Sequence, residues 1–165
     1  MPIIKTVYGD ILDAVEKYVC QQCNCNTIKA HGLSRSIADK YYWANPYCNR
    51  RQKSNNSTSE PDEPGTILEL RHPTNPDNYP VFLCMMAQWC PGKPGAYKHY
   101  YSTTYDDTYE NRKEWFSECL AILDEKKYGV VAMPYYIGCG LAGGIWSDYE
   151  KMLNECETNI VLYKK

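Results

Sequence analysis

A glycine-rich segment near the C-terminus, residues 135–147, constrains the fold of this chain more than any other part of its sequence. It follows the apolar run 129–134, which has the pattern of a buried strand, and precedes a helical pattern over 148–157. Glycines in a strand-to-helix turn let backbone N–H groups converge without an obstructing Cβ, and the helix N-terminus adds partial positive charge. The segment therefore predicts either a phosphate-binding loop or a tight connection.

Apolar patterns predict alternating strands and helices along the rest of the chain. We expect strands at 3–8, 19–24, 66–70, 81–87, 129–134 and 159–163, and helices at 33–42, 109–126 and 148–157. The strand–helix alternation of the later half indicates a mainly parallel or mixed sheet with helices on both faces. Ligands of such sheets bind at the C-terminal ends of the strands.

The length of 165 residues fits one domain spanning 1–165. Within it, the polar stretch 49–65 is expected to form a flexible surface loop, and 91–107 an irregular stretch rich in Gly, Pro and Tyr. A net charge of −2 predicts no bulk binding of nucleic acid. No apolar run reaches the roughly 18 residues of a membrane helix, and the N-terminus lacks the apolar region of a signal peptide. We expect an intracellular protein, cytoplasmic or nuclear, that is a monomer.

Nine cysteines are an odd number, and several lie inside apolar patterns, as reduced buried cysteines do. Cys20, Cys23 and Cys25 have the spacing of a partial metal clip. A structural zinc site takes about four ligands, and the sequence has no second C-x-x-C pair. We therefore expect no metal and no cofactor.

Four short motifs fall at predicted strand ends or in the loops beyond them. They are Gly-Asp-Ile at 9–11, Cys-Asn-Cys-Asn at 23–26, His-Gly-Leu at 31–33, and the glycine-rich 137–144. In this order, over nearly the whole chain, they resemble the macrodomain family, an ADP-ribose-binding module. The similarity is closest to the branch of yeast-type ADP-ribose-1″-phosphate phosphatases and terminal ADP-ribose glycohydrolases, and it extends to Trp146 and the closing Val-Leu-Tyr. The resemblance implies a three-layer α/β/α fold with a mixed central sheet.

The resemblance also implies the binding residues. The carboxylate of Asp10, between Gly9 and Ile11, would accept a hydrogen bond from the adenine amino group, and Asn24 or Asn26 would hold the distal ribose. The first diphosphate loop would contain Gly32 and Leu33. The remaining expected contacts are Ile137, Gly138, Cys139, Gly140, Leu141, Ala142 and Gly143 of the second loop, and Tyr163 near the C-terminus.

These residue types have structural interpretations as well. Asp10 would cap a turn, and either asparagine would form an Asx-turn after its strand. His31 stands where family members often have a glycine, so it would narrow the first loop, contact the ligand, or lie on the surface without a role.

The catalytic residues of the related branch have no match here. The glycohydrolase lysine corresponds to Ala38, its aspartate to Ala142, and the phosphatase histidine to Gln21. None of these side chains can act as a nucleophile or proton carrier. The sequence therefore predicts an ADP-ribose-binding macrodomain.

The alternative is a hydrolase acting on an ADP-ribose derivative by substrate-assisted or water-mediated chemistry. Its substrate would be the 1″-phosphate, an acyl ester, or an ADP-ribosylated protein or nucleic acid. His31 and Asp148 are the candidate catalytic residues in that case, since they are the titratable residues nearest the two loops. Asp148 also suits a helix cap.

Overall fold

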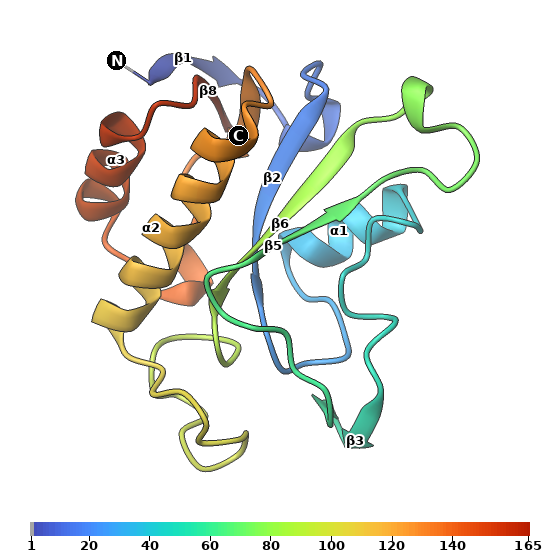
Figure 1. The fold of residues 1–165 in the computed structure, drawn as a ribbon, viewed down its shortest axis with the longest axis vertical. Coiled ribbons are helices and arrows are strands. Elements are labelled where there is room, and N and C mark those ends of the chain that lie inside the picture. Colours follow the sequence, from blue (N-terminus) through green and yellow to red (C-terminus); the bar gives the residue numbers. More distant parts are fainter. Residues whose placement is uncertain (1) are drawn as a thin grey trace.

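A six-stranded sheet forms the centre of the structure, a computed structural model that describes residues 2–165 (Figure 1). The strand order is β1-β8-β7-β2-β6-β5. Strand β5 pairs antiparallel with β6, and the other neighbouring strands of this sheet are parallel. The strands are β1 (Ile3–Tyr8), β2 (Tyr18–Asn24), β5 (Ile67–Leu70), β6 (Val81–Gln88), β7 (Val131–Pro134) and β8 (Ile160–Lys164).

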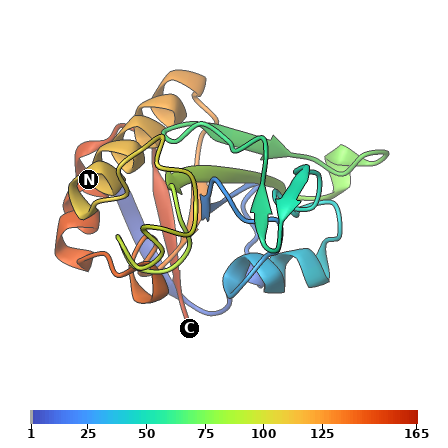
Figure 2. The same cartoon turned by 90° about the horizontal axis from the view of Figure 1, so that it is seen from below.

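Helices cover both faces of this sheet (Figure 2). Helix α1 (Leu33–Lys40) lies on one face, and α2 (Tyr109–Lys126) and α3 (Trp146–Glu155) lie on the other. Short 3-10 turns occur at η1 (Ile11–Asp13), η2 (Pro76–Asn78) and η3 (Gly140–Ala142). The predicted α/β/α architecture with a mixed sheet is confirmed.

An apolar core lies on each face of the sheet, because successive side chains of a strand point to opposite sides. On β6, Leu83 and Met85 pack on the side of α2 and α3, where they share a core with Phe116. Phe82 packs on the opposite side with Ile37 of α1. Strand β6 is buried along its whole length, as a strand covered on both faces must be.

Every predicted strand and helix is present, with bounds that differ by at most two residues. The sequence analysis missed a small hairpin, β3 (Gln52–Ser54) with β4 (Ser57–Thr58), which lies inside the polar stretch 49–65. The flexibility of that stretch remains a prediction. Within residues 2–165, no helix is both long and apolar enough to cross a bilayer.

Truncating a leucine on the fully buried strand β6 should destabilise the protein strongly. Leu83 is 0% exposed, so Leu83→Ala should lower the free energy of unfolding by about 2–5 kcal/mol through lost burial and a residual cavity. The matched control is Leu68→Ala on β5, where the side chain is 37% exposed and the loss should be below about 1 kcal/mol. Urea denaturation measures both, and equal losses would contradict the assignment of the core.

Candidate functional site

A cavity of about 410 Å³ opens at the C-terminal ends of β2, β6 and β7. One wall is the segment that follows β2 and includes Gly32 and Leu33. The opposite wall is the end of β7 and the glycine-rich segment after it, namely 134–139, Leu141 and Ala142. A third wall is Pro91–Gly92 after β6. The cavity lies where the topology of a parallel sheet places ligands.

Two loops, the first around Gly32 and the second over residues 137–144, are called here the two glycine loops. Both contribute backbone N–H groups that have no protein partner. Gly32 precedes α1 with φ 58° and ψ −130°, a conformation that favours glycine, and the first-turn N–H groups of a helix have no intrahelical acceptor. Among residues 2–165, no hydrogen bond is donated by the backbone N–H of Gly32, Leu33, Gly138 or Leu141, all of which line the cavity. The two loops meet where a Cβ on Gly32 would lie 3.7 Å from Leu141 Cδ1. This arrangement suits an anion held between the loops.

Side-chain amides form part of the cavity lining. Gln22 Nε2 donates to Gln88 Oε1 at 2.8 Å, and Gln88 Nε2 donates to the carbonyl of Cys90 at 3.2 Å. The bond to Cys90 fixes the orientation of the Gln88 amide. The bond from Gln22 to Gln88 then fixes the orientation of the Gln22 amide. Gln22 Oε1 is left buried without a partner among the described residues.

Asn24 and Asn26 both have structural hydrogen bonds. Asn24 Oδ1 accepts the backbone N–H groups of Asn26 at 3.0 Å and Thr27 at 2.9 Å, which is an Asx-turn. Asn26 Nδ2 donates to the carbonyl of Trp89 at 2.7 Å. Asn24 lines the cavity, whereas Asn26 is not among the lining residues.

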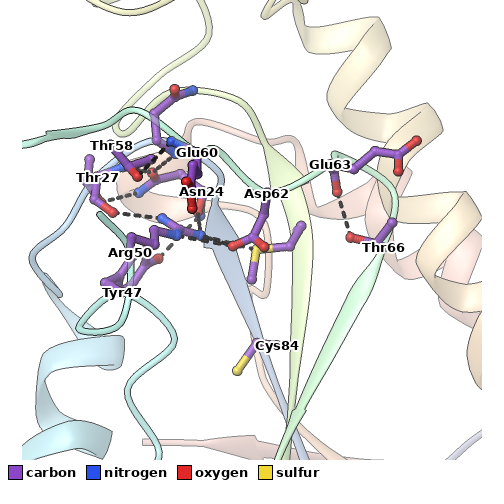
Figure 3. Close-up of polar contacts among 12 residues, drawn as sticks. Asn24, Thr27, Tyr47, Arg50, Thr58, Glu60, Asp62, Glu63, Thr66 and Cys84 are labelled. Carbon is purple, nitrogen blue, oxygen red and sulfur yellow. Dashed lines mark hydrogen bonds and ion pairs between the residues drawn. The ribbon is translucent and has the colours of Figure 1, made fainter. Parts of the chain in front are cut away.

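Arg50 holds the loop after β2 in place (Figure 3). Its Nη2 donates to Asp62 Oδ2 and to the carbonyl of Asn24, both at 2.7 Å, and its Nη1 donates to the carbonyl of Thr27 at 2.7 Å. The guanidinium lies 4.7 Å from the ring centroid of Tyr47. The end of β2 and the loop after it are therefore tied to the polar stretch 49–65 beyond α1.

Arg112 of α2 holds the opposite side of the cavity. All five N–H donors of its guanidinium are used: Nε and Nη2 each donate to the Asp107 carboxylate at 2.7 Å. Nη1 donates to the carbonyls of Gly92 and Ala142, and Nη2 also to that of Cys90. The side chain joins the loop after β6 to the second glycine loop.

The cavity contains eight of the residues predicted to bind ligand: Asn24, Gly32, Leu33, Ile137, Gly138, Cys139, Leu141 and Ala142. Gly9, Asp10, Ile11, Asn26, Gly140, Gly143 and Tyr163 lie outside its lining. The ligand roles of all these residues remain predictions.

Asp10 and Tyr163 have structural partners instead. Asp10 Oδ1 accepts the backbone N–H of Leu12 at 3.0 Å, which caps η1, and Lys165 Nζ lies 3.2 Å from Oδ2. These two contacts, the first above all, lower the pKa of Asp10. The hydroxyl of Tyr163 donates to Glu16 at 2.6 Å.

The candidate catalytic positions are divided in space. His31 and Ala142 line the cavity, but Ala38 and Asp148 do not. Asp148 accepts a hydrogen bond from the Tyr109 hydroxyl at 2.6 Å, and this contact lowers its pKa. Gln21 is buried and accepts from the Ser34 hydroxyl at 2.7 Å.

The cysteine of the second glycine loop, Cys139, is not activated as a nucleophile. Burial, with a smaller contribution from Asp148, raises the pKa of Cys139 to about 11, so its thiol is protonated near neutral pH. All nine cysteines are free, and Cys20, Cys23 and Cys25 are buried. Within residues 2–165, no three His, Cys, Asp or Glu side chains gather closely enough to hold a metal ion.

Sequence reasoning missed several lining residues: Gln22, Lys29, Ser34, Tyr47, Gln88, Pro91, Gly92, Pro134, Tyr135 and Tyr136. For Gln22 a signal existed, because strand alternation places it on the same side of β2 as Asn24. No local pattern distinguishes Tyr47 or Gly92, which reach the cavity through long-range packing.

The second glycine loop allows a matched test of backbone requirements. A Cβ on Gly138 would clash with the ring of Tyr149, whereas one on Gly140 would meet nothing within 4 Å, and both residues have positive φ. Gly140→Ala should cost about 1–2 kcal/mol of stability. Gly138→Ala should cost about 1–3 kcal/mol more. Equal shifts in urea denaturation would rule out the close packing described for Gly138.

Comparison with known proteins was made by sequence and by fold. Neither a protein-family model nor a curated protein matches the sequence. Among solved structures, the macrodomain of Thermus aquaticus DarG is 17% identical, has a TM-score of 0.57, and matches 98% of this chain and 97% of its own. The macrodomain of Mycobacterium tuberculosis DarG is 15% identical, with a TM-score of 0.58 and 96% of each chain covered.

A third structure is Thermosipho africanus DarTG in complex with ADP-ribose. It is 16% identical with a TM-score of 0.60, and the match covers 97% of this chain and 41% of that one. At these levels of identity the comparison establishes the architecture, and all three agree on it. The chain has the macrodomain fold.

Proposed function

We propose that this chain binds ADP-ribose, free or attached to another molecule, in the cavity between the two glycine loops. The observation that carries the proposal is the set of unpartnered N–H groups that both loops contribute to one cavity. Such groups are the usual protein partners of a diphosphate. The likeness to a DarTG structure in complex with ADP-ribose supports the same ligand.

The charge of the lining also favours an anion. The residues that line the cavity include Lys29 and His31 and, within the described chain, no Asp or Glu. A ligand diphosphate would lie between Gly32 and Leu141, and the terminal ribose would lie toward the amides of Asn24 and Gln88. Amides suit ribose hydroxyls because they can both donate and accept.

The same lining favours binding over hydrolysis by a side-chain nucleophile or general base, while substrate-assisted hydrolysis would need neither. General acid–base chemistry needs a group that exchanges protons near the working pH, and nucleophilic catalysis needs an activated nucleophile. The protonated thiol of Cys139 supplies neither, and Ala142 has no functional group. His31 is the remaining candidate, and it makes no hydrogen bond to a second side chain that would orient it, among residues 2–165.

A charge placed in the cavity should abolish binding without unfolding the protein. Ala142→Glu puts a carboxylate beside the expected diphosphate, and like-charge repulsion should weaken ADP-ribose binding by at least about thirtyfold. The matched control is Ala121→Glu on the exposed side of α2, which should bind normally. Titration calorimetry measures both affinities, and thermal melts check the fold. No binding by the wild type would refute the proposed function.

The adenine end needs a separate test, because Asp10 lies outside the cavity. If its carboxylate recognises adenine, Asp10→Ala should weaken ADP-ribose binding by about five- to a hundredfold. Asp13→Ala, in the same 3-10 turn and paired with Lys40, is the control and should have little effect. An unchanged affinity for Asp10→Ala would confine the role of Asp10 to capping η1.

A further inference from the structure

A second cavity, of about 520 Å³, lies beside the first, under the loop that joins β6 to α2. This loop projects beyond the lower end of the sheet in Figure 1, in yellow-green. Its folded form depends on internal contacts: Trp89 Nε1 donates to the carbonyl of Ser102 at 2.6 Å, and Asp107 accepts the backbone N–H of Cys90 at 3.0 Å. None of the residues that line this cavity lines the first one.

A single stretch of backbone separates the two cavities. Pro91 and Gly92 line the first cavity, whereas Cys90 and Pro94, on either side of them, line the second. Arg112 donates to the carbonyls of Cys90 and Gly92 and so fixes this wall. A bound molecule that extends out of the first cavity past Pro91 and Gly92 would therefore lie next to the residues of the second cavity.

The terminal ribose of the proposed ligand lies at this end. Gln88, which we assign to the ribose, is bonded to the Cys90 carbonyl at the start of the wall. When ADP-ribose is attached to another molecule through its terminal ribose, the attached molecule must leave the cavity on this side. The second cavity is placed to receive it.

The lining of the second cavity fits a peptide better than a nucleic acid. Lys98 and Asp106 are exposed, and neither forms an ion pair among residues 2–165, so each is available to an opposite charge. Tyr105, Pro94 and the hydroxyl of Thr103 add the mixed apolar and polar surface typical of protein interfaces. A phosphate backbone would meet the exposed carboxylate of Asp106 and a single lysine, Lys98, instead of a run of cations.

We propose that this second cavity binds the peptide segment that carries ADP-ribose, with Lys98 pairing an acidic residue of the peptide and Asp106 a basic one. The inference rests on the proposed function of the first cavity. It adds to the nucleotide cavity a separate subsite for the attachment segment, formed by the loop that joins β6 to α2.

Affinities for matched ligands test this inference. The probes are free ADP-ribose, a short peptide ADP-ribosylated on serine with Glu on one side and Lys on the other, the same peptide unmodified, and an ADP-ribosylated oligonucleotide. The modified peptide should bind about tenfold more tightly than free ADP-ribose. Lys98→Glu and Asp106→Lys should remove this gain and leave the affinity for free ADP-ribose unchanged. Lys53→Glu, on the separate hairpin, is the matched charge reversal and should have no effect.

The double variant combines Lys98→Glu with Asp106→Lys. A modified peptide in which Glu and Lys are exchanged should again bind this variant tightly. If the two residues only supported the loop structure, the exchange would restore nothing. The inference is wrong if the modified peptide binds no more tightly than free ADP-ribose, or if the variants weaken both ligands equally. A larger gain for the oligonucleotide would overturn it in favour of nucleic acid. Failure of free ADP-ribose to bind at all would instead refute the function of the first cavity.

Discussion

The buried guanidinium of Arg112 is the contact on which the geometry of the site most depends. Its side chain is 2% exposed and pairs with Asp107, which is 7% exposed. Burying an ion pair costs several kcal/mol per ion before the mutual attraction is counted, and the cost is recovered only when every donor is satisfied. Here each N–H has an acceptor, three of them backbone carbonyls from the loops around the cavity. The same contacts therefore stabilise the fold and position the site.

Arg50 performs the corresponding task on the other side, through the carbonyls of Asn24 and Thr27. The segments that line the cavity leave the sheet and lack its ladder of hydrogen bonds, so their carbonyls need other donors. A planar guanidinium can serve several carbonyls and a carboxylate at once, which a lysine ammonium on a flexible stem does poorly. The two arginines thus satisfy loop carbonyls, while the N–H groups of Gly32 and Gly138 stay available to a ligand.

The sequence predicted the architecture well because the core follows simple periods. Alternation on β6 separates Leu83 from Phe82, and the helical spacing of α2 buries Trp115 and Cys119 together. The second loop was visible as a glycine-rich strand-to-helix turn, whereas the first has the single glycine Gly32 and was identified only through the family resemblance. Arg50 and Arg112 were not, because each reads as an ordinary surface charge until residues 20 to 30 positions away are folded against it. Gln88 lies one residue beyond the strand predicted at 81–87, and nothing in the sequence indicated that its side chain would contact Gln22.

The two alanines at the expected catalytic positions have different meanings in the folded chain. Ala142 lines the cavity, and its carbonyl is bound by Arg112, so a longer side chain there would project from a fixed backbone. Ala38 is on α1 and outside the lining. A nucleophile and a proton carrier act as a unit and must converge on one atom. In this chain only Ala142 of the two lines the cavity, so the two positions are not equivalent.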